Sequence, residues 1–244
     1  MKKRFLSAAL TVAMAVSMTA CSSKPAETAP ATEAAAPAET EAAGEETEAK
    51  EAAADTGDKE LITVGYAQVG AESDWRTANT ESFKSTFTEE NGYKLIFDDA
   101  QQKQENQIKA IRSFIQQDVD YIVVAPVVET GWETVLEEAK EAGIPVILSD
   151  RMMQVSDDSL FEAWVGGNFV KEGETCGNWL ADYLEAQGRG DEEINIVTIQ
   201  GTIGASAQVG RTEGFANVLA EHSNWKMLDM QTGEFTQAKG QEVM

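Results

Sequence analysis

Asp150 and Arg151 stand together at the end of an apolar run, residues 145–149, and are the side chains in this sequence best suited to binding chemistry. A short aliphatic run of this kind predicts a buried strand of a parallel sheet, because both faces must meet helices. Open α/β sheets bind ligands beyond the carboxyl ends of such strands. A carboxylate accepts hydrogen bonds from two neighbouring hydroxyls, and a guanidinium donates to ring and hydroxyl oxygens. The pair suits a polyol or a sugar, although a salt bridge that only caps the strand is an equally good interpretation of the dipeptide alone.

Trp75 and Arg76 form a second candidate pair, near the end of the strand expected over residues 61–67. Ser73 or Asp74 is expected to cap the helix that follows, which places both residues in its first turn. The flat face of Trp75 could stack on the C–H face of a pyranose or furanose, while Arg76 donates to a hydroxyl. The alternative is that Trp75 closes the core and Arg76 is solvated.

Other reactive residue types give weaker signals. The neighbouring carboxylates Asp98 and Asp99, and likewise Asp157 and Asp158, could serve acid–base work on a glycoside. Adjacent strand residues point to opposite sides, however, and the second pair lies in a loop, so an enzyme is the minor alternative. With His222 the only histidine, neither a histidine metal site nor a Ser-His or Cys-His catalytic site has a supporting cluster, and we expect no metal and no cofactor.

Strands and helices are expected to alternate along the chain. Strands are predicted over residues 61–67, 93–97, 121–125, 145–149, 194–199 and 225–230, with helical patterns between them and an extended crossing at 160–165. This alternation predicts an α/β fold with parallel sheets and helices on both faces. In the helix after Asn168, the spacing places Cys176 in a stripe with Phe169, Gly173, Leu180 and Tyr183, so Cys176 is expected to be inert packing.

The expected domain boundaries follow from these elements. Residues 60–159 form a first lobe, residues 160–167 a hinge crossover, and residues 168–244 a partial second lobe. The second lobe contains too few strands to close a doubly wound sheet, which leads us to expect a chain shortened at its carboxyl end. Apolar helix residues such as Phe215 and Leu219 would then remain uncovered.

The first 59 residues have a different composition. Lys2, Lys3 and Arg4 precede an apolar run that ends in small residues and Cys21, the layout of a secretory signal. The sequence before Cys21 resembles the lipobox of bacterial lipoproteins, which implies a signal peptide over residues 1–21 and a lipid anchor on Cys21. Residues 22–59 are rich in Ala, Glu, Thr and Pro, as expected of a disordered tether. The net charge of −23 argues against a nucleic acid partner.

Several longer motifs resemble a known family, the periplasmic sugar-binding proteins of ABC importers of the ribose and galactose type. The motifs are QVGAESDWR at 68–76, QQKQENQI at 101–108, APVVETGW at 125–132, DR at 150–151, QGTIGAS at 200–206 and GEFT at 233–236. The resemblance implies two doubly wound α/β lobes, joined by a hinge, that close over a monosaccharide, galactofuranose or a similar sugar. It also implies a monomer outside the cytoplasm that delivers sugar to the membrane subunits of the importer, and the lipobox adds the lipid anchor.

The resemblance further implies which residues bind the sugar. These are Glu72, Ser73, Asp74, Trp75, Arg76, Asp150, Arg151, Asn168, Arg211 and Phe235. Asn168 is also a good helix cap, which is its more ordinary role. A sugar sensor that docks on a signalling receptor would carry the same residues, so the sequence leaves that function open beside the importer.

Overall fold

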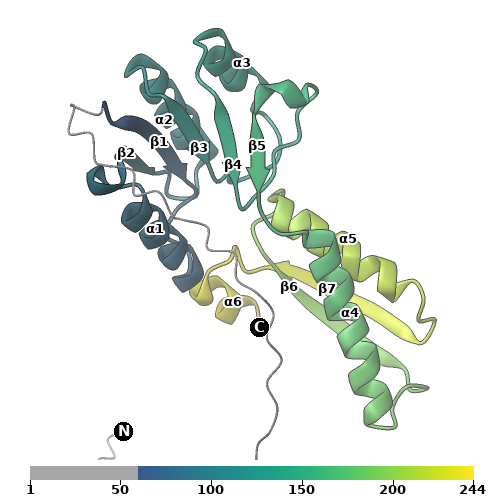
Figure 1. Cartoon of the computed structure of the whole chain (residues 1–244). Coiled ribbons are helices and arrows are strands. Elements are labelled where there is room, and N and C mark those ends of the chain that lie inside the picture. The colour runs from purple at the N-terminus through teal and green to yellow at the C-terminus, as the bar shows by residue number, and fades with distance from the viewer. Residues whose placement is uncertain (1–59) are drawn as a thin grey trace, which may run out of the picture. The chain divides into compact units, whose positions relative to one another are not determined.

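The computed structural model describes residues 60–244 (Figure 1). The expected signal peptide, the lipid anchor on Cys21 and the tether over residues 22–59 lie outside the described residues. Two parallel sheets are present, one of five strands and one of two. The sequence-based prediction of an α/β fold with parallel sheets is therefore confirmed.

The first lobe is built on the five-stranded sheet, whose order is β2-β1-β3-β4-β5. All neighbouring strands in it are parallel. Its strands are β1 (Ile62–Gln68), β2 (Tyr93–Asp99), β3 (Tyr121–Val124), β4 (Val146–Ser149) and β5 (Ala163–Val165). Because β1 lies between β2 and β3, the chain reverses its direction of travel across the sheet after β2, as in doubly wound folds.

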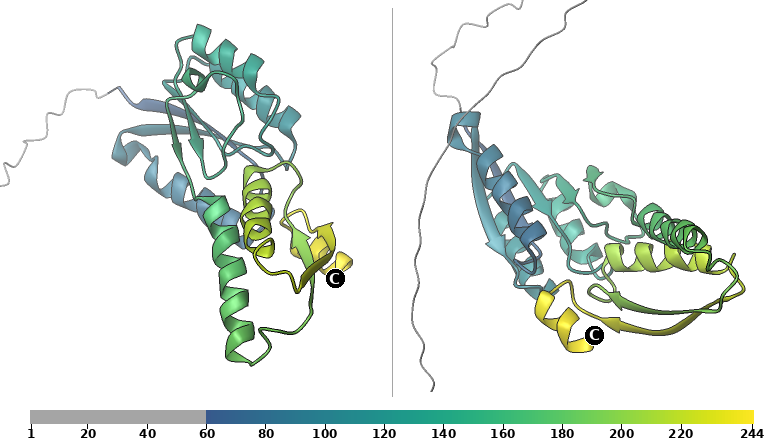
Figure 2. Two further views of the ribbon diagram at one scale, coloured as in Figure 1. Left: turned by 90° about the vertical axis from the view of Figure 1, so that its right-hand side faces the viewer. Right: turned by 90° about the horizontal axis from the view of Figure 1, so that it is seen from below.

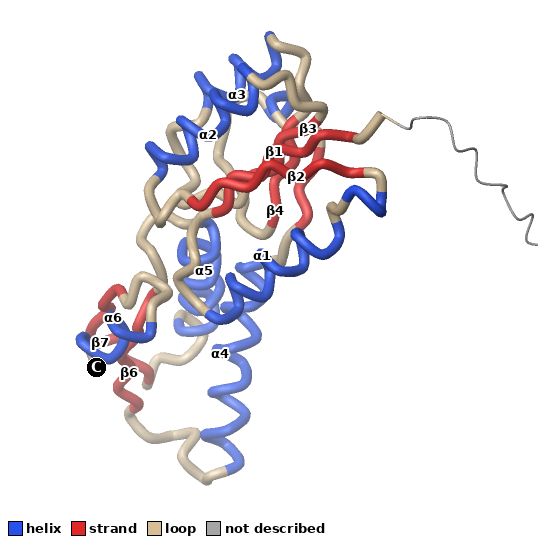
Figure 3. Tube along the Cα trace, turned by 90° about the vertical axis from the view of Figure 1, so that its left-hand side faces the viewer, coloured by secondary structure: helices blue, strands red, loops and turns tan. Residues whose placement is uncertain are grey.

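Helices cover both faces of this sheet (Figure 3). The helices are α1 (Asp74–Thr86), α2 (Gln104–Gln116) and α3 (Glu133–Glu141). Buried residues of α2 and α3, including Ile111 and Leu136, pack with Ile122 and Leu148 in the larger core. Phe83 and Phe87 belong to a second cluster, around Val64 and Tyr66. Burial on both faces explains why β1, β3 and β4 are nearly continuous apolar runs.

The second lobe contains β6 (Ile194–Gln200) and β7 (Trp225–Thr232), with α4 (Phe169–Ala186), α5 (Ser206–Leu219) and α6 (Gln237–Val243). Helices α4 and α5 pack side by side (Figure 2). Leu184 and Val218 from these helices pack with Ile194 and Trp225 from the strands. Phe215 and Leu219 are partly buried against this cluster rather than fully exposed.

Helix ends agree with the sequence in several places. The Ser73 side chain accepts a hydrogen bond from the Arg76 amide and caps α1, and Asn168 caps α4 by accepting from the Lys171 amide. Gly143 follows α3 with φ of 74°, a left-handed conformation that favours glycine. Short 3₁₀ turns at Glu89–Asn91 and Asp158–Leu160 were not anticipated.

The predicted role of Cys176 is wrong, since this residue is exposed. The expected stripe on α4 is correct at Phe169 and Gly173, but the buried face continues through Gly177 and Leu184 rather than Cys176 and Tyr183. A side chain at Gly173 would collide with the carbonyl oxygen of Arg211 on α5. Close approach of the two helices thus selects the glycine face and leaves Cys176 outside it.

Candidate functional site

Four charged side chains from two stretches of the chain, residues 72–76 and 150–151, meet at the carboxyl ends of the first-lobe strands. Asp150 and Arg151 follow β4, Arg76 lies in the first turn of α1, and Glu72 precedes that helix. Arg76 donates from Nη2 to Asp150 Oδ2 at 2.7 Å and from Nε to Glu72 Oε1 at 3.1 Å. Arg151 Nη2 lies 3.4 Å from the same Glu72 oxygen. We call these four residues the charge cluster.

The charge cluster is balanced and strongly buried. The side chains of Glu72, Arg76 and Arg151 are 2%, 2% and 4% exposed, and that of Asp150 is 16% exposed. Burial, followed by the positive charge of Arg76, lowers the pKa of Arg151 to about 10. Arg151 is therefore still protonated at neutral pH, and two guanidinium groups face two carboxylates with no net charge.

Two atoms of the charge cluster have no hydrogen-bond partner among the described residues. They are Glu72 Oε2 and Arg76 Nη1, and both are buried. A buried polar atom without a partner costs about 1–3 kcal/mol, and more when the group is charged. One is an acceptor and the other a donor, and a hydroxyl group can partner either kind of atom.

Asp150 reaches its position through an unusual backbone conformation. Its φ is 64°, which is uncommon for a residue other than glycine and costs about 1–2 kcal/mol. The backbone on both sides holds it there, because the Asp150 amide donates to Val165 O at 2.7 Å and Trp164 Nε1 donates to Asp150 O at 3.1 Å. A side chain at Gly166 would collide with that carbonyl, so this position requires glycine.

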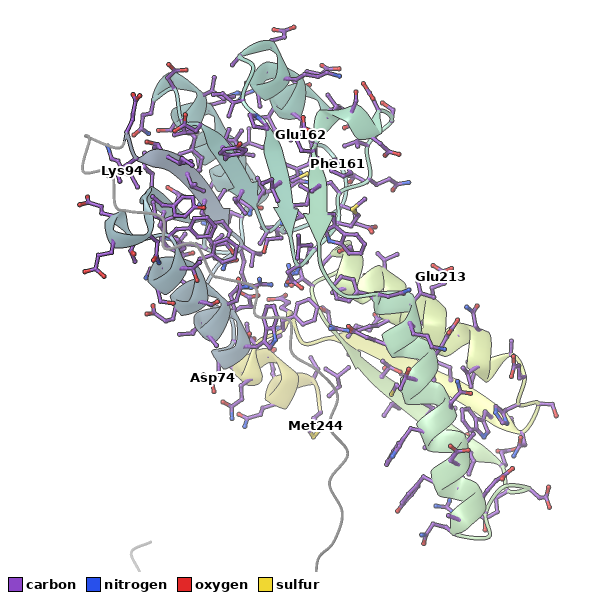
Figure 4. All side chains as sticks on the ribbon, in the orientation of Figure 1. Asp74, Lys94, Phe161, Glu162, Glu213 and Met244 are labelled. Carbon is purple, nitrogen blue, oxygen red and sulfur yellow. The ribbon has the colours of Figure 1, made fainter. Side chains whose placement is uncertain are left out.

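The rim beside the charge cluster contains the remaining first-lobe candidates. Trp75 is 59% exposed, with the Arg76 guanidinium 4.9 Å from its ring centre. Asp74 is exposed at the start of α1 (Figure 4), where its charge favours the helix N-terminus. The alternative that Trp75 closes the core while Arg76 is solvated is wrong on both counts.

Of the second-lobe candidates, Phe235 reaches the charge cluster, with its ring 4.9 Å from the Arg151 guanidinium. Phe235 has φ of 58°, and its ring packs so closely on Gly201 that no side chain fits there. Arg211 instead pairs with Glu172 at 2.8 Å, and both side chains are nearly half exposed. Its charge nevertheless contributes to the lowered pKa of Arg151.

A cavity of about 830 Å³ lies in the second lobe, and none of the four residues of the charge cluster lines it. Its walls are mainly apolar side chains of α4, α5 and β6, together with Arg211 and Phe235. A monosaccharide exposes a hydroxyl on almost every carbon and requires convergent polar partners. The charge cluster supplies such partners, so it is the better candidate for a sugar site.

The family follows from the sequence match. Residues 64–244 match the family described as periplasmic binding protein domain, which is well over half of the chain. The chain belongs to the periplasmic binding protein family. The predicted resemblance is thereby confirmed at the level of the family.

Individual relatives of this periplasmic binding protein carry sugar names. It is 49% identical over 183 residues to the galactofuranose-binding protein of Escherichia coli strain K12, covering 75% of this chain and 56% of that protein. A Mycobacterium smegmatis structure in complex with β-D-fucofuranose is 49% identical, with a TM-score of 0.71 over 75% of this chain and 59% of the other. The binding protein of the Shewanella sp. ANA-3 arabinose ABC transporter, bound to α- and β-L-arabinofuranose, is 52% identical, with a TM-score of 0.68 over 74% and 58%.

The chain therefore spans somewhat more than half the length of these relatives. The family and the relatives named above are binding proteins, not enzymes. In this periplasmic binding protein, the neighbouring carboxylates at 98–99 and 157–158 include residues that make local structural hydrogen bonds. Asp99 accepts from the Gln101 amide, and Asp157 accepts from the Ser159 amide at a turn.

Sequence reasoning missed two buried polar residues behind the charge cluster, Gln68 and Gln107, both 0% exposed. Gln107 could have been found, because it lies four residues before Ile111 and therefore on the apolar face of α2. A glutamine at a core position needs several hydrogen-bond partners and so indicates a special role. Within residues 60–244, no group of His, Cys, Asp and Glu is placed to hold a metal ion, and no helix is long and apolar enough to cross a bilayer.

Proposed function

We propose that this chain is the sugar-binding component of an extracytoplasmic receptor for an ABC importer, and that its ligand is a neutral monosaccharide in furanose form, such as galactofuranose. The observation that carries this proposal is the charge cluster, which has no net charge and holds one buried acceptor and one buried donor free of protein partners. Three relatives with furanose names at about 50% identity support the choice of ligand.

The proposed roles of the residues follow from their chemistry. Asp150 and Arg151 would bind neighbouring hydroxyls, Arg76 and Glu72 would take a further hydroxyl through their free atoms, and Trp75 would stack on the sugar ring. Phe235 would contact the sugar from the second lobe. Ser73 and Asp74 would shape the rim, and Asn168 and Arg211 would complete the second-lobe side of the site.

Titration calorimetry tests the ligand. The chain would be titrated with galactofuranose, galactose, ribose and arabinose, and with galacturonate as a charged comparison. We expect binding of a neutral furanose and much weaker binding of the acid, because a balanced cluster offers no countercharge to an additional carboxylate. Products that appear during incubation would indicate an enzyme, and failure of every monosaccharide to bind would refute the sugar proposal.

Asp150→Ala provides the matched variant for the site. Loss of the carboxylate removes the acceptor for sugar hydroxyls and leaves Arg76 and Arg151 with one fewer partner. Losing charge-assisted hydrogen bonds in a closed site costs about 2–4 kcal/mol of binding free energy. Glu133→Ala, on α3, is a comparison at a carboxylate outside the site.

We propose further that Cys21 carries lipid and holds a monomeric protein at the outer face of the membrane. Cys21→Ser should move the protein from the membrane fraction to the soluble fraction, and equal solubility of the unchanged chain would contradict the anchor. Uptake of sugar by vesicles containing the importer membrane subunits would support delivery. A signalling receptor that responds to the sugar-loaded protein, with no uptake, would support the sensor instead.

A further inference from the structure

Gln107 is fully buried where the ends of two central strands and the following loop meet. Its Nε2 donates to Ala67 O at 3.1 Å and to Ala125 O at 2.7 Å, and its Oε1 accepts from the Val127 amide at 2.9 Å. Ala67 belongs to β1, Ala125 directly follows β3, and Val127 lies in the loop from β3 to α3. One planar amide therefore binds three backbone groups and joins β1 to the loop after β3.

The last of these contacts leads directly to the charge cluster. The amide of Val127 and the carbonyl of Pro126 belong to one planar trans peptide, so they point in opposite directions. When Gln107 holds the amide on one side, the carbonyl must face the other side. Arg151 Nη1 lies there, 3.5 Å from Pro126 O and 3.3 Å from Val127 O. The orientation of the guanidinium thus depends on a peptide that Gln107 orients.

A second buried glutamine, Gln68, holds a different member of the charge cluster. Its Nε2 donates to Asn79 Oδ1 at 2.9 Å and to Thr80 Oγ1 at 3.0 Å, and its Oε1 accepts from the Val69 amide at 3.0 Å. Both of the accepting side chains are on α1, one turn after Arg76. Gln68 therefore fixes the helix that carries Arg76, and none of these hydrogen bonds reaches the Pro126–Val127 peptide.

We infer that Gln107 is a positioning residue for sugar binding, which acts by orienting the Pro126–Val127 peptide and through it the guanidinium of Arg151. The inference rests on the proposed function, because the effect on affinity requires Arg151 to bind the sugar. Glutamine suits this position because it supplies two donors and an acceptor from one neutral plane. A methionine of similar size removes all three of these hydrogen bonds, although Ala67 O still accepts from the Ala125 amide at 3.2 Å. A glutamate retains an acceptor for the Val127 amide.

Crossed double-mutant cycles test the inference in the full chain. One cycle combines Gln107→Met with Arg151→Lys, and another combines Gln68→Met with Arg76→Lys. The crossed cycles combine Gln68→Met with Arg151→Lys and Gln107→Met with Arg76→Lys. Sugar affinity would be measured by calorimetry and the unfolding equilibrium by urea denaturation. We expect Gln107→Met to weaken binding about tenfold or more, and to weaken it less than about twofold further when Arg151→Lys is already present. The Gln68–Arg151 and Gln107–Arg76 pairs should couple more weakly than Gln107 and Arg151, because they are linked only indirectly, through Glu72, which both arginines contact.

Two further variants separate orientation from loss of stability. Ile111→Val is one turn from Gln107 on α2 and is fully buried in the core, so it should lower the melting temperature and leave sugar affinity unchanged. Gln107→Glu should retain more affinity than Gln107→Met, even if its melting temperature is no higher. If Gln107→Met does not fold, Gln107→Glu can be used in its place to measure the effect on sugar affinity.

Different results overturn different statements. Additive effects of Gln107→Met and Arg151→Lys, on affinity and on unfolding alike, would overturn the positioning role. So would an unchanged affinity in a folded Gln107→Met. If the unchanged chain binds no sugar, the proposed function fails instead, and coupling between the same two residues in the unfolding equilibrium still decides whether Gln107 orients Arg151.

Discussion

The first and second lobes use the same parallel strand–helix units but bury their apolar residues to different degrees. In the first lobe, Ile122 and Leu148 are 0% exposed because helices cover both faces of the sheet. In the second lobe, Val197 and Leu228 are 70% and 61% exposed, on the face of the sheet opposite α4 and α5.

Charged side chains are also more deeply buried in the first lobe than in the second. Arg76, Glu72 and Arg151 are enclosed in the first lobe, whereas the Arg211–Glu172 pair of the second lobe is nearly half exposed. A charge can be buried only where a packed shell holds its partners in place, because an unpaired buried charge is very unfavourable. The first lobe therefore supplies the preorganised half of the proposed site, and the second lobe supplies Phe235.

The largest expected difference between the lobes is in the protection of their backbone amides from hydrogen exchange. We expect backbone amides of β1, β3 and β4 to exchange with solvent about a thousandfold more slowly than those of β6 and β7, since protection follows buried contacts. The part after residue 167 should also be cut first in limited proteolysis. Hydrogen exchange followed by mass spectrometry measures both lobes in one sample. Equal exchange rates in the two lobes, together with a single cooperative melting transition, would show that the lobes do not differ in stability.

Core truncation gives the next largest contrast. Leu136→Ala, at a residue 0% exposed in the first-lobe core, should lower the free energy of unfolding by about 3–5 kcal/mol. Leu228→Ala, at an exposed position of β7, should change it by about 0.5 kcal/mol or less. Urea denaturation of both variants tests this, and a large loss from Leu228→Ala would show that its face of the sheet is covered in solution.

Arginine removal compares the two kinds of ion pair. Arg76→Ala leaves Glu72 and Asp150 short of a partner in a buried setting, and we expect a loss of about 3 kcal/mol in the free energy of unfolding. Arg211→Ala breaks a solvent-exposed pair with Glu172 and should cost about 1 kcal/mol or less. Similar losses from both variants in urea denaturation would contradict the difference in burial.

The smallest expected effect is a pH-dependent one at the edge strand of the first lobe. Burial, and then the neighbouring Asp99, raises the pKa of Asp98 above its ordinary value of 3.8. The folded state therefore disfavours the charged form of Asp98. The resulting loss in the free energy of unfolding is absent below pH 3.8 and complete once the pH exceeds the pKa of the folded state. Asp98→Asn should raise the melting temperature at pH 7 by about 2 °C or less, with a smaller gain at pH 4.

Asp157 offers a control of opposite sign for the same measurement. Hydrogen bonds from Ser159 hold the pKa of Asp157 below its ordinary value, so its contribution is present above that value and is lost as the pH falls through the folded pKa. Asp157→Asn should therefore lower the melting temperature at pH 7 and have less effect in acid. A gain from Asp157→Asn at pH 7 would show that these local effects do not control the pH dependence.

The local pattern of the sequence predicts the order of strands and helices, a cap of α1 at Ser73 or Asp74, the cap of α4 at Asn168, and the placement of Asp150 and Arg151 at a strand end. These features depend on the period and chemistry of neighbouring residues, which can be read without knowing the rest of the fold. The family motifs added Glu72 and Phe235 to the candidate site.

The packing of helices against sheets sets which side chains are enclosed. The tertiary structure buried Arg76 and exposed Trp75, turned the glycine face of α4 toward α5 instead of Cys176, and placed Gln107 against the peptide that receives Arg151. Each of these outcomes depends on a contact between segments distant in the sequence. A periodic pattern shows that a helix has a buried face, but the neighbouring element decides where that face begins and which polar groups on it find partners.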